Sequence, residues 1–316
     1  MSVAISRRSI FQPNEKTTMQ NFDHNATRFR AQNALLLARL CNAAYGTEEE
    51  GRSLTEQMGF TDFRWVKLEQ PLENTSALIV GCDDFAAIAF CGTKDLKNWM
   101  TDLHSTPGRF AWFFRGAPDI GEVHAGFAFA LRHSWEKIVQ AMNFVLPPVA
   151  TPVAVIDGLS TRPQKTLWIT GHSLGGALAA LAGGVFSMLP GGIIRPIGGV
   201  YTFGQPRIGL HNFCGAYDRL LAAKTFRFIN REDLVPRVPF RGWNYADLGQ
   251  MIHFDSHGKP QLESREWSNF LARTFEGFAD FIQITTHLTP DVGDHSRQGY
   301  EQLVREHQSE LEALFA

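Results

Sequence analysis

The sequence is poor in several features that would point to a specialised class of protein. Its four cysteines are too few and too scattered for a disulfide framework, so we expect reduced thiols. Its 30 basic and 32 acidic residues give a net charge of −2, and this balance does not favour binding to nucleic acid or to an anionic membrane. No Gly/Ser-rich or charged linker divides the 316 residues. We therefore expect one domain over residues 22–316, preceded by a loose polar arm at residues 1–21.

The sequence also lacks a convincing export or membrane segment. Ser6-Arg-Arg-Ser9 has the form of a twin-arginine signal, but the polar Gln12–Lys16 stands where an apolar segment should follow. The longest uncharged stretch, Ala177–Ile194, contains Pro190 and several glycines, so it fits a buried helix and loop better than a membrane span. We expect a cytoplasmic location by default, with leaderless secretion as the alternative, and no transmembrane segment.

Apolar runs of strand length alternate with helical periodicities along the chain. Helices are expected over residues 25–45, 125–146 and 300–315. Strands are expected at residues 64–68, 77–81, 85–91, 167–169, 199–203 and 225–230. This alternation predicts an α/β fold with a mainly parallel sheet covered by helices on both faces.

The most informative segment runs from Leu167 to Ala180 and has the form of a strand, a tight turn and a helix. The turn is Gly171-His-Ser-Leu-Gly175, which is the pattern of a nucleophile elbow. The flanking glycines let strand and helix approach closely, so Ser173 is the candidate nucleophile. The backbone N–H of Leu174 at the helix start is a candidate oxyanion donor. A glycine-rich helix start with a capping serine is the alternative.

A serine nucleophile needs a base, and several histidines follow Ser173 in the chain order serine, acid, histidine that accompanies such an elbow. His295 lies in a turn just before the C-terminal helix, from which it can reach over the sheet edge. His253 and His257 are its main rivals. His307 belongs to the amphipathic C-terminal helix and is expected to be exposed.

The candidate acid is Asp233, which follows the strand at residues 225–230. The carboxyl ends of parallel strands are where such sheets place their sites. The neighbouring Glu232 should point away, because side chains alternate along an extended chain. A structural role for Asp233 as a turn cap is the alternative.

A second oxyanion donor is expected in Cys91-Gly-Thr93, directly after the apolar run at residues 85–90. Gly92 permits close approach of the backbone, which makes the N–H of Thr93, with its hydroxyl, the candidate. Asp102 is placed to hold that hydroxyl, although a helix cap is the competing interpretation of this residue.

Taken together, these segments resemble the class 3, fungal-type lipase family of α/β hydrolases. Five motifs match in order: Phe90-Cys-Gly-Thr93, Asn98-Trp-Met-Thr-Asp-Leu103, Val123-His-Ala-Gly-Phe127, Gly171-His-Ser-Leu-Gly-Gly176, and Tyr201-Thr-Phe-Gly-Gln-Pro-Arg207 leading to Asp233-Leu-Val-Pro236. The resemblance covers residues 30–305 and implies an α/β-hydrolase fold. It also implies a triad of Ser173, Asp233 and His295, an oxyanion hole at Thr93 and Leu174, support from Asp102 and His172, and no metal or cofactor.

Two features of this chain stand out against the family pattern. The family usually has Arg where this chain has Cys91, so any ion pair made there must be replaced or absent. The irregular, aromatic stretch at residues 105–121, with Phe110, Trp112, Phe113 and Phe114, is expected to contribute apolar surface to an acyl groove.

In this family a short helix after the oxyanion strand acts as a lid, and residues 96–103 occupy that place. Leu96, Trp99, Met100 and Leu103 fall on one helical face, which can cover the site in water and turn outward at a lipid surface. An ordinary amphipathic surface helix is the alternative.

These observations predict a serine carboxylic-ester hydrolase that acts on acylglycerols or other apolar acyl esters, with lipid or ester as its partner at a lipid–water interface. A phospholipase A1 or an aryl- or feruloyl-type esterase on the same scaffold is the nearest alternative. A catalytically silent, lipase-like binding or signalling protein is the alternative from a different class. The complete serine, acid and histidine set argues against that last interpretation.

Overall fold

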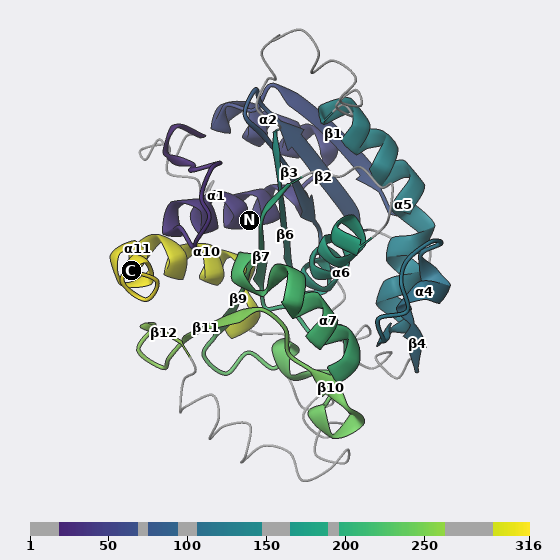
Figure 1. The fold of residues 1–316 in the computed structure, drawn as a ribbon. Coiled ribbons are helices and arrows are strands. Elements are labelled where there is room, and N and C mark those ends of the chain that lie inside the picture. The colour runs from purple at the N-terminus through teal and green to yellow at the C-terminus, as the bar shows by residue number, and fades with distance from the viewer. Residues whose placement is uncertain (1–18, 69–74, 94–105, 147–164, 189–195, 263–292) are drawn as a thin grey trace, which may run out of the picture.

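An eight-stranded sheet forms the centre of the protein (Figure 1). The computed structural model describes residues 19–68, 75–93, 106–146, 165–188, 196–262 and 293–316. The strands lie in the order β1 (Asp62–Lys67), β2 (Ser76–Gly81), β3 (Phe85–Phe90), β6 (Thr166–His172), β7 (Ile197–Phe203), β9 (Thr225–Asn230), β11 (Gln250–Phe254) and β12 (Pro260–Leu262).

The middle of the sheet is parallel and its edges are antiparallel. Strands β3, β6, β7, β9 and β11 run parallel, whereas β1, β2 and β12 join them through antiparallel pairs. The central strands are buried on both faces, which explains their continuous apolar sequence. The expected mainly parallel sheet is confirmed.

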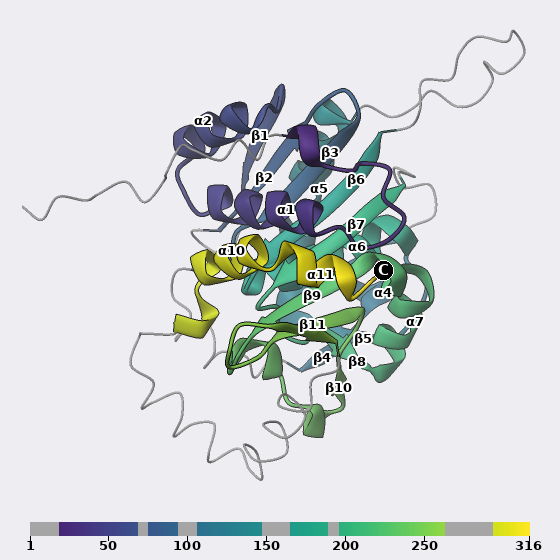
Figure 2. The same ribbon diagram turned by 90° about the vertical axis from the view of Figure 1, so that its left-hand side faces the viewer.

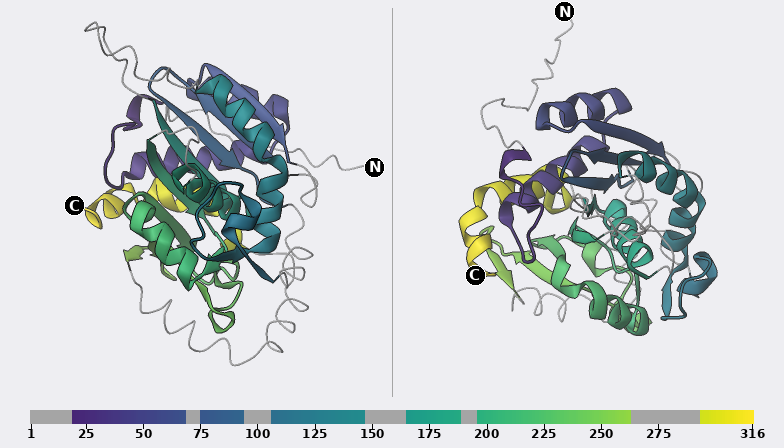
Figure 3. Two further views of the ribbon diagram at one scale, coloured as in Figure 1. Left: turned by 45° about the vertical axis from the view of Figure 1, so that its right-hand side comes forward. Right: turned by 45° about the horizontal axis from the view of Figure 1, so that its top comes forward.

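Helices cover both faces of this sheet. On one face lie α1 (Ala31–Ala44), α10 (Arg297–Glu306) and α11 (Gln308–Ala313), as Figure 2 shows. The opposite face carries α5 (Ala125–Val145), α6 (Leu174–Met188) and α7 (His211–Leu221), visible in Figure 3. The side chains of β1, β2, β3, β6 and β7 divide between two cores, one under each helical layer.

Helix boundaries differ from the sequence prediction at both ends of the chain. The helix expected from residue 25 begins only at Ala31, after an extended Arg30, although Phe29 before it is fully buried. The C-terminal helix breaks at His307, between α10 and α11. The side chain of His307 is only 19% exposed and lies near the Phe254 ring, so the expectation of an exposed histidine was wrong.

One helix, α2 (Glu48–Met58), was not predicted although its start is legible in the sequence. The Thr47 side chain accepts a hydrogen bond from the backbone of Glu50, and the Glu50 side chain accepts one from the backbone of Thr47. This reciprocal capping box is a local signal that a motif search could have found. A short 3-10 helix, η1 (Met19–Asn21), precedes α1.

A small antiparallel sheet stands beside the main one. Its strands lie in the order β10 (Tyr245–Ala246), β8 (Gly209–Leu210), β5 (Glu122–His124) and β4 (Pro107–Arg109), and α4 (Phe110–Phe113) follows β4. The stretch expected to be irregular is therefore partly regular.

The aromatic residues of this stretch divide between core and surface. Phe110 and Phe114 are buried, with ring centroids 5.0 Å apart, and Phe110 also packs on Phe213. The acyl-groove expectation is thus wrong for these two side chains, because core packing takes up their apolar surface. Phe113 is half-buried, and Trp112 is 74% exposed.

The connecting segments include the 3-10 helices η3 (Ala222–Lys224), η4 (Val235–Arg237), η5 (Arg241–Trp243) and η6 (Gly293–His295). All four cysteines fall within the described ranges and are buried thiols. Among the helices that the structure describes, none combines the length and the apolar character needed to cross a membrane.

Candidate active site

Ser173 stands in the turn between β6 and α6 with a strained backbone. Its φ angle is 60°, in the left-handed region that side chains with a Cβ rarely adopt. A Cβ on Gly171 would lie 2.1 Å from the Gly175 carbonyl oxygen, and a Cβ on Gly175 would lie 2.1 Å from that of Phe90. Both positions therefore require glycine, and the strand–turn–helix geometry is that of a nucleophile elbow.

The end of β7 connects the elbow to the candidate acid and base. The Ser173 N–H donates to the Phe203 carbonyl oxygen at 2.9 Å. Gly204, the residue after Phe203, has φ +60°. A Cβ on Gly204 would lie 2.8 Å from His295 Cε1 and 2.9 Å from Asp233 Oδ2. Gly204 belongs to a motif that carried the family resemblance, but its role was not predicted. Its absent side chain makes room for the His295–Asp233 pair.

His295 and Asp233 form a buried pair. The distance from His295 Nδ1 to Asp233 Oδ2 is 2.8 Å, and the two side chains are 5% and 0% exposed. Asp233 Oδ1 accepts a hydrogen bond from the Val235 N–H at 2.9 Å, so the carboxylate also shapes its own turn. The turn-cap interpretation and the functional one are therefore compatible.

The other candidates for the pair lie elsewhere. His253 is on β11, with its Nε2 2.9 Å from the carbonyl oxygen of Arg231. His257 is exposed in the turn after β11. Glu232 is exposed, as side-chain alternation predicted. The structure thus brings together His295 and Asp233 out of the candidates that the sequence left open.

Two buried atoms of the site have no hydrogen-bond partner within the described ranges: Ser173 Oγ and His295 Nε2. Ser173 is 1% exposed and His295 is 6% exposed. Because Nδ1 of His295 is engaged by a carboxylate, that nitrogen carries the proton, and Nε2 presents a lone pair. The arrangement can therefore take a proton from a hydroxyl close to His295.

The loop after β3 runs beside the elbow. The parallel pairing of β3 with β6 sets Phe90 opposite Gly171. A Cβ on Gly92 would lie 3.1 Å from the Cβ of Ser173, which places Thr93 next to the nucleophile's turn. Leu174, the first residue of α6, is fully buried, and its N–H belongs to the helix start. Asp102 and the expected lid residues Leu96, Trp99, Met100 and Leu103 lie outside the described residues.

His172 has both ring nitrogens engaged. Its Nδ1 lies 2.8 Å from the Tyr45 hydroxyl, and its Nε2 lies 2.8 Å from the carbonyl oxygen of His295. Burial, with a contribution from neighbouring His295, holds the pKa of His172 well below its usual range. The ring is therefore neutral.

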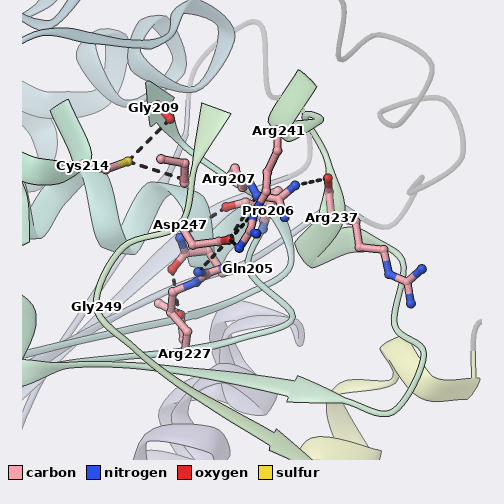
Figure 4. A network of polar contacts seen from close by, with 12 residues as sticks. Gln205, Pro206, Arg207, Gly209, Cys214, Arg227, Arg237, Arg241, Asp247 and Gly249 are labelled. Atoms are coloured by element: carbon pink, nitrogen blue, oxygen red, sulfur yellow. Dashed lines mark hydrogen bonds and ion pairs between the residues drawn. The ribbon is translucent and has the colours of Figure 1, made fainter. Parts of the chain in front are cut away.

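A network of arginines around Asp247, of which Arg207 and Arg227 are buried, lies beyond β7 and was not predicted (Figure 4). Asp247 Oδ1 accepts hydrogen bonds from Arg207 Nε at 3.1 Å and Arg227 Nη1 at 3.0 Å, and Oδ2 accepts one from Arg241 Nη2 at 2.5 Å. The backbone N–H of Arg207 also donates a hydrogen bond to the Val238 carbonyl oxygen at 2.8 Å. The network thus ties the segment after Gly204 to the segment that follows Asp233.

The parallel sheet, the strained serine elbow and the buried histidine–aspartate pair together have the arrangement of the α/β-hydrolase fold. Residues 87–243, about half of the chain, match the family model described as Lipase (class 3). The chain belongs to the class 3 lipase family, as its motifs predicted.

Curated relatives agree with this assignment. Triacylglycerol lipase OBL1 of Ricinus communis is 30% identical over 236 residues, which cover 62% of this chain and 43% of that protein. Phospholipase A1-II 2 of Oryza sativa subsp. indica is 26% identical over 222 residues, which cover 67% of this chain and 54% of that protein. The chain thus spans about half the length of these curated relatives.

A solved triacylglycerol lipase structure, whose catalytic centre is described as a serine protease triad, has the same fold. It superposes with a TM-score of 0.54 at 22% identity, covering 78% of this chain and 91% of that one. The α/β-hydrolase fold is therefore confirmed.

Proposed function

We propose that this protein hydrolyses the carboxylic esters of lipids through an acyl-enzyme. The observation that carries the proposal is the buried His295–Asp233 hydrogen bond of 2.8 Å beside an elbow that holds Ser173 at a φ of 60°. A serine held in this way is a nucleophile once a base can take its proton. The proposal assigns Ser173 as nucleophile, His295 as base and Asp233 as the acid that orients the base.

Each step of the reaction uses one of these groups. Ser173 Oγ attacks the ester carbonyl carbon while its proton passes to His295 Nε2, and Asp233 stabilises the resulting imidazolium. The N–H groups of Leu174 and Thr93 bind the tetrahedral oxyanion. His295 then protonates the leaving alcohol, and water, activated by the same histidine, releases the fatty acid from Ser173.

Acylglycerols are the proposed substrates, because the named relatives include triacylglycerol lipases. A phospholipase A1 activity is the second candidate, since enzymes of that name are also among the relatives. Either substrate is an apolar acyl ester, so the chemistry at Ser173 is the same. The two differ only in the head group that the pocket must accept.

The direct test compares the native protein with Ser173→Ala. A fluorophosphonate probe should label the native protein and not the variant, and release of fatty acid from emulsified trioleoylglycerol should fall by more than about 10⁴-fold. Gly215→Ala, on the exposed side of α7, serves as a folded control. Full turnover by Ser173→Ala would rule out the proposal, and native protein that neither labels nor turns over would favour the silent binding protein.

A parallel substrate series separates the candidate activities. Trioleoylglycerol, 1,2-dioleoylphosphatidylcholine and an aryl ester are offered under the same conditions, and the position of the released acyl chain is determined. Preferential cleavage of the triacylglycerol supports a lipase, whereas release of the sn-1 chain from the phospholipid supports a phospholipase A1. Selective cleavage of the aryl ester would overturn the lipid assignment while leaving the serine mechanism in place.

The burial of the nucleophile predicts a dependence on the lipid surface. Ser173 is 1% exposed, so an ester reaches it only after atoms above it have moved. We propose that an interface promotes this movement, as a lid would. The rate on short-chain esters should rise sharply above their solubility limit; a smooth profile across that limit indicates a plain esterase.

A further inference from the structure

The residue before the nucleophile is connected directly to the backbone of the proposed base. A carbonyl oxygen can only accept, so the 2.8 Å contact between His172 Nε2 and the His295 carbonyl requires a proton on Nε2. A neutral ring then has a lone pair on Nδ1, which accepts from the Tyr45 hydroxyl at 2.8 Å. The two partners together determine a single tautomer of His172.

Tyr45 stands where several segments of the site meet. It is the C-cap residue of α1, and a Cβ on Gly92 in the oxyanion loop would lie 2.2 Å from its hydroxyl oxygen. The Arg297 guanidinium lies over its ring, 4.4 Å from the ring centroid. Arg297 follows His295 by only two residues. The backbone around His295 is therefore connected to Tyr45 twice, through His172 at the hydroxyl and through Arg297 at the ring face.

Burial, with smaller contributions from the charges of His295 and Arg297, lowers the pKa of His172 and so disfavours protonation of its ring. The His295 ring centroid lies 4.6 Å away, the Tyr300 ring lies 5.8 Å away, and Arg297 contributes a positive charge from α10. No acidic group is among the influences on His172 within the described residues. His172 therefore keeps its tautomer and does not compete with His295 for the Ser173 proton.

We propose that Tyr45 and His172 form a positioning pair that sets the direction of the His295 imidazole through its backbone carbonyl. Two hydrogen bonds then determine the orientation of the His295 ring. Asp233 binds its Nδ1, and His172 donates to the backbone carbonyl of His295. Because His172 is covalently bonded to Ser173, a single residue couples the position of the nucleophile to that of the base. The pair acts on position alone and transfers no proton.

The family's usual arginine at the Cys91 position is absent, and Arg297 supplies a cation to this cluster from a different point in the chain. Cys91 is buried beside Gly92, with its Sγ 3.1 Å from the Gly92 carbonyl oxygen. The guanidinium over Tyr45 thus comes from the base's own segment.

The test uses two substitutions of His172, each of which keeps a polar group at the place of only one ring nitrogen. The amide N–H of Gln in His172→Gln reaches the place of Nε2 and can still donate to the His295 carbonyl, whereas Asn in His172→Asn reaches only the place of Nδ1. This inference rests on the proposed function, so Ser173→Ala is run beside them. We expect kcat on a soluble ester to fall about 10–100-fold in His172→Asn, with KM within about twofold of native.

The Gln variant should retain about tenfold more kcat than the Asn variant. Both should keep the shape of the native pH–kcat profile, because His172 carries no proton that the reaction uses. Equal kcat in the two variants, whether both native-like or both low, would overturn the proposal, since loss of ring packing is common to both. So would a displaced pH profile, which would make His172 a proton carrier.

Tyr45→Phe provides a second, milder measurement. It removes only the hydroxyl that donates to His172 Nδ1, so that the His295 carbonyl alone favours the Nε2–H tautomer, and nitrogen-15 NMR of histidine-labelled protein reports which ring nitrogen is protonated. We expect Nε2–H alone in the native protein and a mixture in the variant, with a lower kcat. A native tautomer and native kcat in Tyr45→Phe would overturn the role of Tyr45. An inactive native protein would instead refute the proposed function itself.

Discussion

Tyr300 donates a hydrogen bond of 2.6 Å to Asp233 Oδ2, the same oxygen that contacts His295 Nδ1. Burial and the neighbouring negative charge of Asp233 raise the pKa of the Tyr300 hydroxyl well above its usual range, so it stays protonated and acts as the donor. Its oxygen also accepts from the Asn230 N–H at 3.0 Å. Tyr300 therefore ties helix α10 and strand β9 to the carboxylate that orients the base.

Removal of this hydroxyl should impair both activity and stability. In Tyr300→Phe the Asn230 N–H is left buried without its acceptor, which should cost about 1–3 kcal/mol of unfolding free energy. Loss of one donor lets the Asp233 carboxylate turn, so kcat should fall on the order of tenfold. Urea unfolding and ester kinetics measure the two effects.

Tyr217→Phe is the matched control, because its hydroxyl is also buried but bonds Thr225 instead, at 3.1 Å. Tyr217→Phe should lower the free energy of unfolding by about 1 kcal/mol and keep the native kcat. A parallel loss of kcat in Tyr217→Phe would mean that general destabilisation explains both variants.

The elbow should not tolerate a methyl group. Gly171→Ala would set a Cβ 2.1 Å from a backbone oxygen of Gly175, which no side-chain rearrangement can relieve, so the loss should exceed about 4 kcal/mol. Gly215→Ala in α7 meets nothing within 4 Å and should stabilise by about 0.5–1 kcal/mol through helix propensity. Thermal melts of the two variants give the comparison; a native-like melt for Gly171→Ala would show that the turn is looser than described.

Asp247 should be the most sensitive carboxylate outside the site. Asp247→Asn leaves the buried Arg207 and Arg227 without their counter-charge, for an expected loss of about 3–5 kcal/mol. Asp119 also pairs with an arginine, Arg109 at 3.0 Å, but both side chains are 55% exposed. Asp119→Asn should therefore change the unfolding free energy by less than about 1 kcal/mol. Similar losses in both variants would contradict the network's role.

The same network predicts a pH dependence of stability. Burial alone would raise the pKa of Asp247, but the charges of Arg227 and Arg207 outweigh it and hold that pKa well below its usual range. A lowered folded-state pKa means that this stabilisation is present above the unfolded-state value of about 4 and is lost as the pH falls below it. The difference in melting temperature between native protein and Asp247→Asn should shrink below about pH 4. A constant difference down to pH 2 would show that folding does not lower the pKa of Asp247.

Local patterns allowed the central fold to be predicted. The strands β3, β6, β7 and β9 are continuous apolar runs because both their faces are buried, and such runs are visible without any partner. The small sheet could not be predicted in this way, since β8 and β10 have only two residues each and carry no periodicity. Their pairing depends on where the larger elements place them.

The residues of the candidate site likewise divide into those visible in local motifs and those found only through long-range contacts. Ser173 and its glycines are a local motif, and Asp233 follows a strand whose carboxyl end was predicted. Tyr45, by contrast, lies in no motif, and its contact with His172 joins residues 127 positions apart. The Asp247 network likewise joins arginines from three separate segments, which no spacing rule connects.

The sequence by itself determined the elbow, because a strained turn between closely packed elements needs glycine at particular positions beside Ser173. It also determined the parallel sheet and the family. Chain order left several histidines as candidates and only the family resemblance pointed to His295; the tertiary structure brings His295 to Asp233 across a separation of 62 residues. That structure alone decided that Tyr45, His172 and Tyr300 hold this pair. The physical reason is that hydrogen bonds between distant segments depend on how the segments pack, and packing leaves no local repeat in the chain.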